Sequence, residues 1–263
     1  MEKYYKEVGE YYDKDVELGF EKRADTNTSL QRIRGHFRTY VSKQKFTNAL
    51  EIGCGPGLDA EWFGQSFPDK KLHAIDVSAE MAKTADGRTS GFGKVRVSQA
   101  TEHDLSDLPN APFDMTYVFF GALNTVNSLP DAADRIYSSM QPGGVAVLTF
   151  VNKWYMRELL VNLLKLRFKV AFARIRTVWG GYSNFRFLAS RCYTPSNIRK
   201  AFKSFNELDH RGYSILFPAW YNHHKIKGNN DKANRLWEFD EKLNKTPLWQ
   251  FGEYTLFVFQ KPA

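Results

Sequence analysis

The segment from Phe46 to Gly57, which reads F-T-N-A-L-E-I-G-C-G-P-G, constrains this chain more than any other stretch. A short apolar run is followed by Gly53, Gly55 and Gly57, and a helical pattern begins at Leu58. Because glycine lacks a Cβ atom and reaches positive φ, such a turn presents bare backbone N–H groups to a ligand. The segment therefore predicts a strand, a tight ligand-binding turn and a helix.

The spacing of the glycines argues against a dinucleotide. A dinucleotide-binding turn has the pattern G-x-G-x-x-G, whereas this chain has E-x-G-x-G-x-G, with Glu51 before the turn. A carboxylate at that position repels a phosphate and attracts a cation. The segment resembles the first motif of the class I S-adenosylmethionine-dependent methyltransferases. The resemblance implies that Glu51 lies near the methionine end of the cofactor and that the turn, with Gly53, Cys54, Gly55 and Gly57, admits the cofactor.

A second strand is expected over residues 71–77. It contains Asp76, about 20 residues after the glycines, where a doubly wound fold places the acid that binds the ribose hydroxyls. A carboxylate offers two acceptor oxygens to two adjacent hydroxyls. The segment D-V-S-A-E-M is similar to the family's D-x-S-x-x-M, in which Val77 and Met81 flank the adenine. The alternative is a helix N-cap, a role that Ser78 can fill itself.

A third strand is expected over residues 94–98. The family carries an acid or amide after this strand, whose side chain accepts from the adenine amino group, and Gln99 and Ala100 are the matching positions. The neighbouring polar residues remain alternatives for the adenine contact: Thr101, Glu102, His103 and Asp104.

A near-continuous apolar run over residues 113–120 predicts a buried, central fourth strand. Ligands of such folds bind at the carboxyl ends of the strands, so Phe119 and Gly121 are expected beside the methionine portion and Asn124 is available to the substrate. The segment M-Q-P-G-G-V-A-V-L-T-F resembles the family's turn into the fifth strand.

Two amphipathic helices are expected before the glycine turn. The first lies within residues 2–20, where E-V-G-E-Y-Y-D resembles a family segment that closes over the cofactor and implies a contact from Tyr12. A helix packed for stability alone is the competing interpretation. The second covers residues 29–43, and its basic residues, Arg32, Arg34, Arg38 and Lys43, are interpreted as a solvated face.

The resemblance implies an α/β fold with a doubly wound, mostly parallel sheet of seven strands in the order 3-2-1-4-5-7-6, the last strand antiparallel. We expect one methyltransferase domain over residues 1–263: N-terminal cap helices over 1–45, a cofactor-binding core over 46–152, a helical lid inserted over 153–192, and the rest of the fold over 193–263.

A basic and apolar stretch runs from Trp154 to Trp179. Its apolar face is too wide to be left in water. Three interpretations stay open: a lid over the substrate pocket, a homodimer contact, and a peripheral membrane contact through residues 155–178. A nucleic-acid-binding helix is disfavoured, because phosphate contact does not need so many apolar side chains.

Composition and charge limit the partners, the cellular location and the metal or disulfide sites that we expect. The formal charge of +8 permits anionic partners without demanding them. No apolar run approaches a membrane span and the first residues lack an apolar signal region, so we expect a cytoplasmic protein. Two cysteines, Cys54 and Cys192, form no disulfide framework, and no cluster of acids and histidines has metal-ligand spacing.

The family's chemistry is direct displacement at a sulfonium methyl group, which a base assists when the nucleophile carries a proton. Candidates for catalysis are His223, His224 and Tyr221, with Tyr182 and His36 also considered. The segment F-F-G-A-L-N stands where nucleic-acid amino methyltransferases carry the motif N-P-P-Y, so a nucleic-acid substrate is disfavoured. C-terminal aromatics, among them Tyr182 and Trp220, favour a small or medium-sized organic acceptor in natural-product or cofactor metabolism. An RNA or protein methyltransferase and a silent, cofactor-binding regulatory subunit are the alternatives.

Overall fold

The computed structural model describes residues 3–18, 26–178 and 188–263. One sheet contains seven strands: β1 Asn48–Ile52, β2 Lys71–Asp76, β3 Val95–Gln99, β4 Phe113–Val118, β5 Met140–Val151, β6 Asn206–Tyr213 and β7 Tyr254–Gln260. Their order is β3-β2-β1-β4-β5-β7-β6, and β7 runs antiparallel to both of its neighbours. The predicted fold class, strand order and reversal of the last strand are confirmed.

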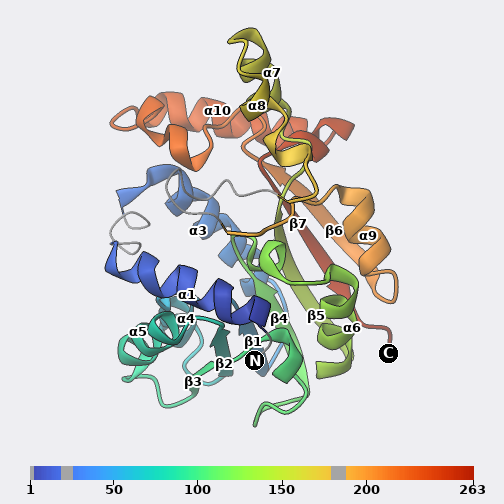
Figure 1. Cartoon of the computed structure of the whole chain (residues 1–263). Coiled ribbons are helices and arrows are strands. Elements are labelled where there is room, and N and C mark those ends of the chain that lie inside the picture. The colour runs from blue at the N-terminus through green and yellow to red at the C-terminus, as the bar shows by residue number, and fades with distance from the viewer. Residues whose placement is uncertain (1–2, 19–25, 179–187) are drawn as a thin grey trace.

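The helices flank the sheet (Figure 1). The α-helices are α1 Lys3–Glu17, α3 Thr28–Ser42, α4 Leu58–Ser66, α5 Ala79–Thr89, α6 Leu129–Ser139, α7 Met156–Leu164, α8 Phe168–Ala171, α9 Pro195–Ala201 and α10 Asn230–Leu243. Short 3-10 helices include η1 Glu102–Asp104, η2 Ala122–Thr125, η3 Ala173–Ile175, η4 Trp220–Lys225 and η5 Pro247–Phe251.

Side-chain caps begin several of these helices. Asn27 accepts a hydrogen bond from the Leu30 backbone at the start of α3, and Ser78 does the same for Met81 at the start of α5. Thr194 forms a reciprocal capping box at the start of α9, followed by a proline in the first turn. Such caps satisfy N–H groups that have no partner within the helix.

Alternation along the strands divides the core into two layers. On β5, Leu148 and Phe150 pack on the side of α6 and α9, whereas Val147 and Val151 pack on the side of α3 and α4. This alternation follows from the two-residue period of a strand. Both faces of the sheet are therefore covered, and the carboxyl edge is left for a site.

Strand β4 ends two residues earlier than the predicted limit at residue 120. Phe120 and Gly121 have φ angles of 53° and 79°, in the left-handed region that a strand cannot continue through. Left-handed backbone in a bulky residue such as Phe120 is uncommon and gathers at ligand sites. The turn after β4 therefore joins the turn after β1 as a candidate part of the site.

Candidate functional site

A cavity of about 580 Å³ opens at the carboxyl edge of the sheet. Its floor is the end of β1, β2 and β4, and its walls come from α1, the start of α3 and η4. Ligands of doubly wound folds bind at this edge, and the volume lies within the ~300–1,000 Å³ range of small-molecule sites. The cavity is therefore the candidate site.

The glycine turn joins β1 to α4 and is fastened to β2. The backbone N–H groups of Gly53 and Cys54 donate to the Ile75 carbonyl at 2.8 and 3.0 Å. The Gly55 N–H donates to Asp76 Oδ2 at 2.8 Å, and the Ser78 N–H donates to Asp76 Oδ1 at 2.9 Å. Each oxygen of Asp76 keeps a second lone pair for a ligand.

Asp76 is buried in the cavity wall. Burial raises the pKa of Asp76 to about 6, against the lowering effect of the hydrogen bonds from Ser78 and Gly55. The carboxyl group is thus ionised at neutral pH but close to taking up a proton. Such a perturbed acid in a cavity is a functional-site signal.

Helix α1 closes one side of the cavity. Ser78 Oγ donates to Asp13 Oδ1 at 2.6 Å, and the Glu80 N–H donates to the same oxygen at 3.1 Å, so α1 is pinned to the first turn of α5. Tyr12 packs beside Val77, and both line the cavity. The predicted position of Tyr12 next to a bound molecule is consistent with this wall.

Glu51 lies beneath the turn rather than in the cavity. Its side chain is 2% exposed, it accepts a hydrogen bond from the Tyr117 hydroxyl at 3.0 Å, and it is absent from the cavity lining. Burial and then the charge of Asp59 raise the pKa of Glu51 well above its usual range. Glu51 therefore does not face the cavity, and its place near the methionine end of the cofactor stays a prediction.

The loop after β3 contributes three cavity residues, Ala100, Thr101 and Glu102. Gln99 does not join them, because its exposed side chain donates to the Val77 carbonyl at 3.1 Å. The Thr101 hydroxyl is engaged in a capping box at the start of η1. Among the alternatives for adenine, the buried carboxyl group of Glu102, which accepts from the Tyr5 hydroxyl, is left facing the cavity.

Arg34 lines the cavity, which corrects its interpretation as part of a solvated face. Its side chain is 13% exposed, its Nε lies 3.2 Å from Asp59 Oδ2, and its guanidinium stands 4.9 Å from the centre of the Phe120 ring. Arg38 also pairs with Asp59, at 2.7 Å. Because two guanidinium groups share one carboxylate, this corner of the cavity keeps a positive charge.

Helix η4 supplies the wall opposite α1, with Trp220, Tyr221 and His223 in the cavity lining. Asn27 Nδ2 donates to the Trp220 carbonyl at 2.8 Å, which fixes η4 to the start of α3. His224 is exposed and absent from the lining, so the structure does not place it with the other catalytic candidates. His36 bonds Tyr213 at 2.8 Å, and burial lowers the pKa of His36 to about 4.

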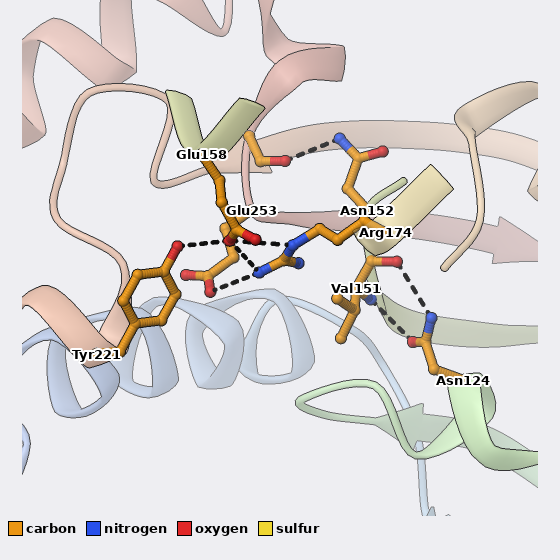
Figure 2. Close-up of polar contacts among 8 residues, drawn as sticks. Asn124, Val151, Asn152, Glu158, Arg174, Tyr221 and Glu253 are labelled. Carbon is orange, nitrogen blue, oxygen red and sulfur yellow. Dashed lines mark hydrogen bonds and ion pairs between the residues drawn. The ribbon is translucent and has the colours of Figure 1, made fainter. Parts of the chain in front are cut away.

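A buried charge network stands behind Tyr221 (Figure 2). The Tyr221 hydroxyl donates to Glu158 Oε2 at 2.6 Å, and Arg174 Nη2 donates to the same oxygen at 3.0 Å. Arg174 Nη2 also lies 3.5 Å from Glu253 Oε1. Burial and then the nearby carboxylates raise the pKa of the Tyr221 hydroxyl, so the hydroxyl keeps its proton and is not available as a base. Tyr221 therefore joins η4 to α7 and η3.

Of the three substrate candidates, Trp220 lines the cavity and Asn124 does not. Asn124 is fully buried: its amide N–H groups donate to the carbonyls of Val151 and Arg191, and its Oδ1 accepts from the Val151 N–H (Figure 2). Its role is to fasten the turn after β4, so its prediction as a substrate contact is wrong. Tyr182 lies outside the described residues.

Most of the predicted cofactor positions meet in the cavity. These residues line it: Tyr12, Gly53, Gly55, Asp76, Val77, Met81, Ala100, Thr101 and Phe119. Four besides Glu51 do not: Cys54, Gly57, Gln99 and Gly121. Gly57 and Gly121 instead shape the turns, since a Cβ on either would stand 2.7–2.8 Å from a neighbouring atom.

Within residues 3–18, 26–178 and 188–263, no helix is long and apolar enough to cross a membrane. The same residues contain no group of three or more His, Cys, Asp or Glu side chains that could hold a metal ion.

A sequence profile of a family described as a methyltransferase domain matches residues 49–144, which hold the glycine turn, Asp76 and the strands up to the start of β5. Malonyl-[acyl-carrier protein] O-methyltransferase 1 of Ilyobacter polytropus is 27% identical over 67% of this chain and 69% of its own length. A trans-aconitate 2-methyltransferase of Deinococcus radiodurans is 24% identical over 68% of this chain and 65% of its own length.

The fold is shared with other methyltransferases of known structure. The N-methyltransferase NodS of Bradyrhizobium japonicum, solved with S-adenosyl-L-homocysteine, superposes with a TM-score of 0.58 at 15% identity, over 97% of this chain and 98% of that chain. At this identity the likeness concerns the fold alone. Residues 49–144 therefore match a methyltransferase domain, and the chain has the fold of the class I S-adenosylmethionine-dependent methyltransferases.

Proposed function

We propose that this enzyme transfers the methyl group of S-adenosylmethionine to a small or medium-sized organic acceptor by direct displacement. A lone pair of the acceptor forms the bond to the methyl carbon while the carbon–sulfur bond breaks, and its electron pair stays on sulfur to give S-adenosylhomocysteine. The observation that carries the proposal is one cavity with the ribose acid Asp76 in one wall and the cation Arg34 in another.

In this proposal the nucleoside lies along β2 and the loop after β3. The Asp76 carboxylate accepts from the two ribose hydroxyls, and its bonds from Gly55 and Ser78 keep it oriented. Val77 and Met81 flank the adenine ring. The carboxylate of Glu102 replaces Gln99 as acceptor for the adenine amino group, since it is the acid of that loop that lines the cavity.

The amino-acid end of the cofactor lies at Arg34. A guanidinium that shares its partner carboxylate with a second guanidinium keeps charge for an anion, and Arg recognises carboxylates by paired hydrogen bonds. The α-carboxylate of the methionine portion is the anion that fits, because Gly53, Gly55 and Phe119 bring the cofactor chain along the strand ends toward Phe120.

The remaining wall receives the acceptor. It is largely apolar and aromatic, with Leu30, Phe120, Trp220 and Tyr254, and His223 is among its polar groups. The malonyl and trans-aconitate groups in the relatives' names carry free carboxyl groups, which supports a carboxylate oxygen as the nucleophile. Such an oxygen is ionised at neutral pH and needs no base, so His223 serves as hydrogen-bond donor that positions it.

Titration calorimetry with S-adenosylhomocysteine tests the cofactor placement. Asp76→Ala is expected to weaken binding about 10- to 100-fold, the range for losing a hydrogen bond to a charged group. Asp114→Ala is the matched control, since Asp114 also accepts from two backbone N–H groups, of Thr47 and Asn48 at 2.8 Å, but at the opposite end of β1. Equal affinity in wild type and Asp76→Ala contradicts the placement.

Turnover of methyl-labelled cofactor against a fractionated metabolite extract tests the acceptor class. We expect transfer to the organic-acid fraction, insensitive to ribonuclease, with label released as methanol by mild alkali because the product is a methyl ester. Label that is lost on ribonuclease or protease treatment supports a macromolecular acceptor. Alkali-stable label on a small molecule retains the methyltransferase but rejects the carboxylate.

A further inference from the structure

The hairpin formed by α7, α8 and η3, residues 156–175, projects from one end of the molecule (Figure 1). None of the residues of α7 is buried. Large apolar side chains are exposed along it, including Leu164 at 84%, Leu166 at 74% and Phe168 at 55%. No residue in 153–178 lines the cavity, and part of the expected lid lies outside the described residues, so the lid stays a prediction.

The outer tip of the hairpin alternates apolar and basic side chains. Seven consecutive residues are exposed, L-K-L-R-F-K-V from Leu164 to Val170, with cations at Lys165, Arg167 and Lys169. Residues 159–178 contain no aspartate or glutamate. The tip therefore offers apolar anchors and uncompensated positive charge on one surface.

Backbone hydrogen bonds close the turn at the tip. The Leu166 N–H donates to the Leu163 carbonyl at 2.9 Å and the Arg167 N–H to the Asn162 carbonyl at 2.8 Å. Leu166 has a φ of 55°, a left-handed conformation that is unfavourable for a branched side chain unless its surroundings hold it. At the base, Arg174 and Glu158 attach the hairpin to Glu253 beside β7 (Figure 2).

The charge of the tip favours an anionic bilayer over a second copy of this chain as its partner. A symmetric contact with a second copy would bring Lys165, Arg167 and Lys169 against the same residues of its partner, and like charges repel. Lysine is also depleted at the centres of protein interfaces. Apolar anchors interleaved with lysine and arginine fit an anionic bilayer, where the apolar groups enter the acyl boundary and the cations meet the headgroups.

We propose that the hairpin of residues 156–175 docks this enzyme on the surface of an anionic lipid bilayer, with Leu164, Leu166 and Phe168 inserted at the headgroup boundary. Lys165, Arg167 and Lys169 lie among the anionic headgroups. The docking does not depend on which acceptor the cavity takes.

Co-sedimentation of the full chain with vesicles tests the docking, using phosphatidylcholine alone or with 30% phosphatidylserine. Wild type is expected to bind the anionic vesicles at low salt and to release from them as salt rises. The triple variant Lys165→Gln/Arg167→Gln/Lys169→Gln should lower the affinity for anionic vesicles about fivefold for each cation removed, on the order of 100-fold together. Leu164→Ser/Leu166→Ser/Phe168→Ser removes roughly tenfold for each side chain.

Leu208→Ser/Lys203→Gln is the matched control, because it changes an exposed apolar and an exposed basic side chain on and beside β6, away from the hairpin. Circular dichroism verifies that every variant is folded. We expect this result because all the substituted side chains are exposed. The proposal is overturned if wild type stays in solution with the anionic vesicles, or if both hairpin variants sediment as the control does. It is equally overturned if the apolar variant only converts a dimer to a monomer in sedimentation velocity.

Discussion

Gly55 offers a test in which stability and ligand binding separate. Gly55 has a φ of 55°, and a Cβ built on it meets no heavy atom within 4 Å because it points into open space beside the cavity. The left-handed conformation costs an L-residue about 1–2 kcal/mol, of which alanine recovers about 0.4–1 kcal/mol through a less flexible unfolded chain. Gly55→Ala should therefore lose only about 1 kcal/mol of stability, a fall of roughly 2–4 °C in Tm.

Gly143 is the matched control in the turn within β5, far from the cavity lining. Its φ is 76°, and a Cβ built there also meets nothing within 4 Å. Gly143→Ala should match Gly55→Ala in a thermal melt. In calorimetry with S-adenosylhomocysteine, Gly55→Ala should lose at least tenfold in affinity, about 1.4 kcal/mol, because its methyl group occupies the path of the cofactor chain, whereas Gly143→Ala should bind as wild type does.

At Gly53, in contrast to Gly55, an added Cβ atom has no space. A Cβ at Gly53 would stand 2.3 Å from the Cβ of Ala122, so Gly53→Ala forces the turns after β1 and β4 apart and should melt far below Gly55→Ala. Wild-type affinity in Gly55→Ala, with the expected small fall in Tm, refutes the placement of the cofactor along the turn. If the Tm of Gly55→Ala falls as far as that of Gly53→Ala, the inference that a methyl group at position 55 meets no neighbouring atom is refuted.

Four further outcomes follow. Arg34→Gln should lower the affinity for S-adenosylhomocysteine about tenfold in calorimetry. The affinity for methylthioadenosine, which lacks the amino-acid group, should not change, and an equal loss for both ligands refutes the carboxylate contact. Cofactor affinity should be constant above pH 7 and fall as pH drops through about 6, because Asp76 then takes up a proton and loses acceptor oxygens; an Asp76→Asn variant should show no such step. His223→Gln should raise KM for the acceptor found by turnover and spare cofactor affinity, while His224→Gln changes neither. Arg174→Met strands the buried carboxylate of Glu253 and the half-buried one of Glu158 and should cost about 3–5 kcal/mol in denaturant unfolding; a loss below 1 kcal/mol contradicts the network.

Local patterns predicted the cofactor half well. The glycine turn, Asp76 and the apolar runs of the central strands encode their structure within a few residues, and the family resemblance that they carry implied the sheet order. Periodicity cannot tell which polar face of a helix meets another element. Arg34 and Arg38 of α3 were read as solvated, yet both pair with Asp59, which follows more than 20 residues later. Glu51 and Asn124 illustrate the same limit: their hydrogen-bond partners, Tyr117 and Val151, are distant in sequence.

The acceptor half depends on contacts that the family pattern does not contain. Tyr221 of η4, Glu158 of α7, Arg174 of η3 and Glu253 at the start of β7 meet in one buried network although they are spread over the last 110 residues or so. Burial raises the pKa of Glu253 to about 7, so this network is a costly way to hold packing alone. Its geometric effect is to join a cavity wall to the base of the projecting hairpin. The tip that we propose to dock on a bilayer is therefore attached, through this network, to the cavity wall that we propose receives the acceptor.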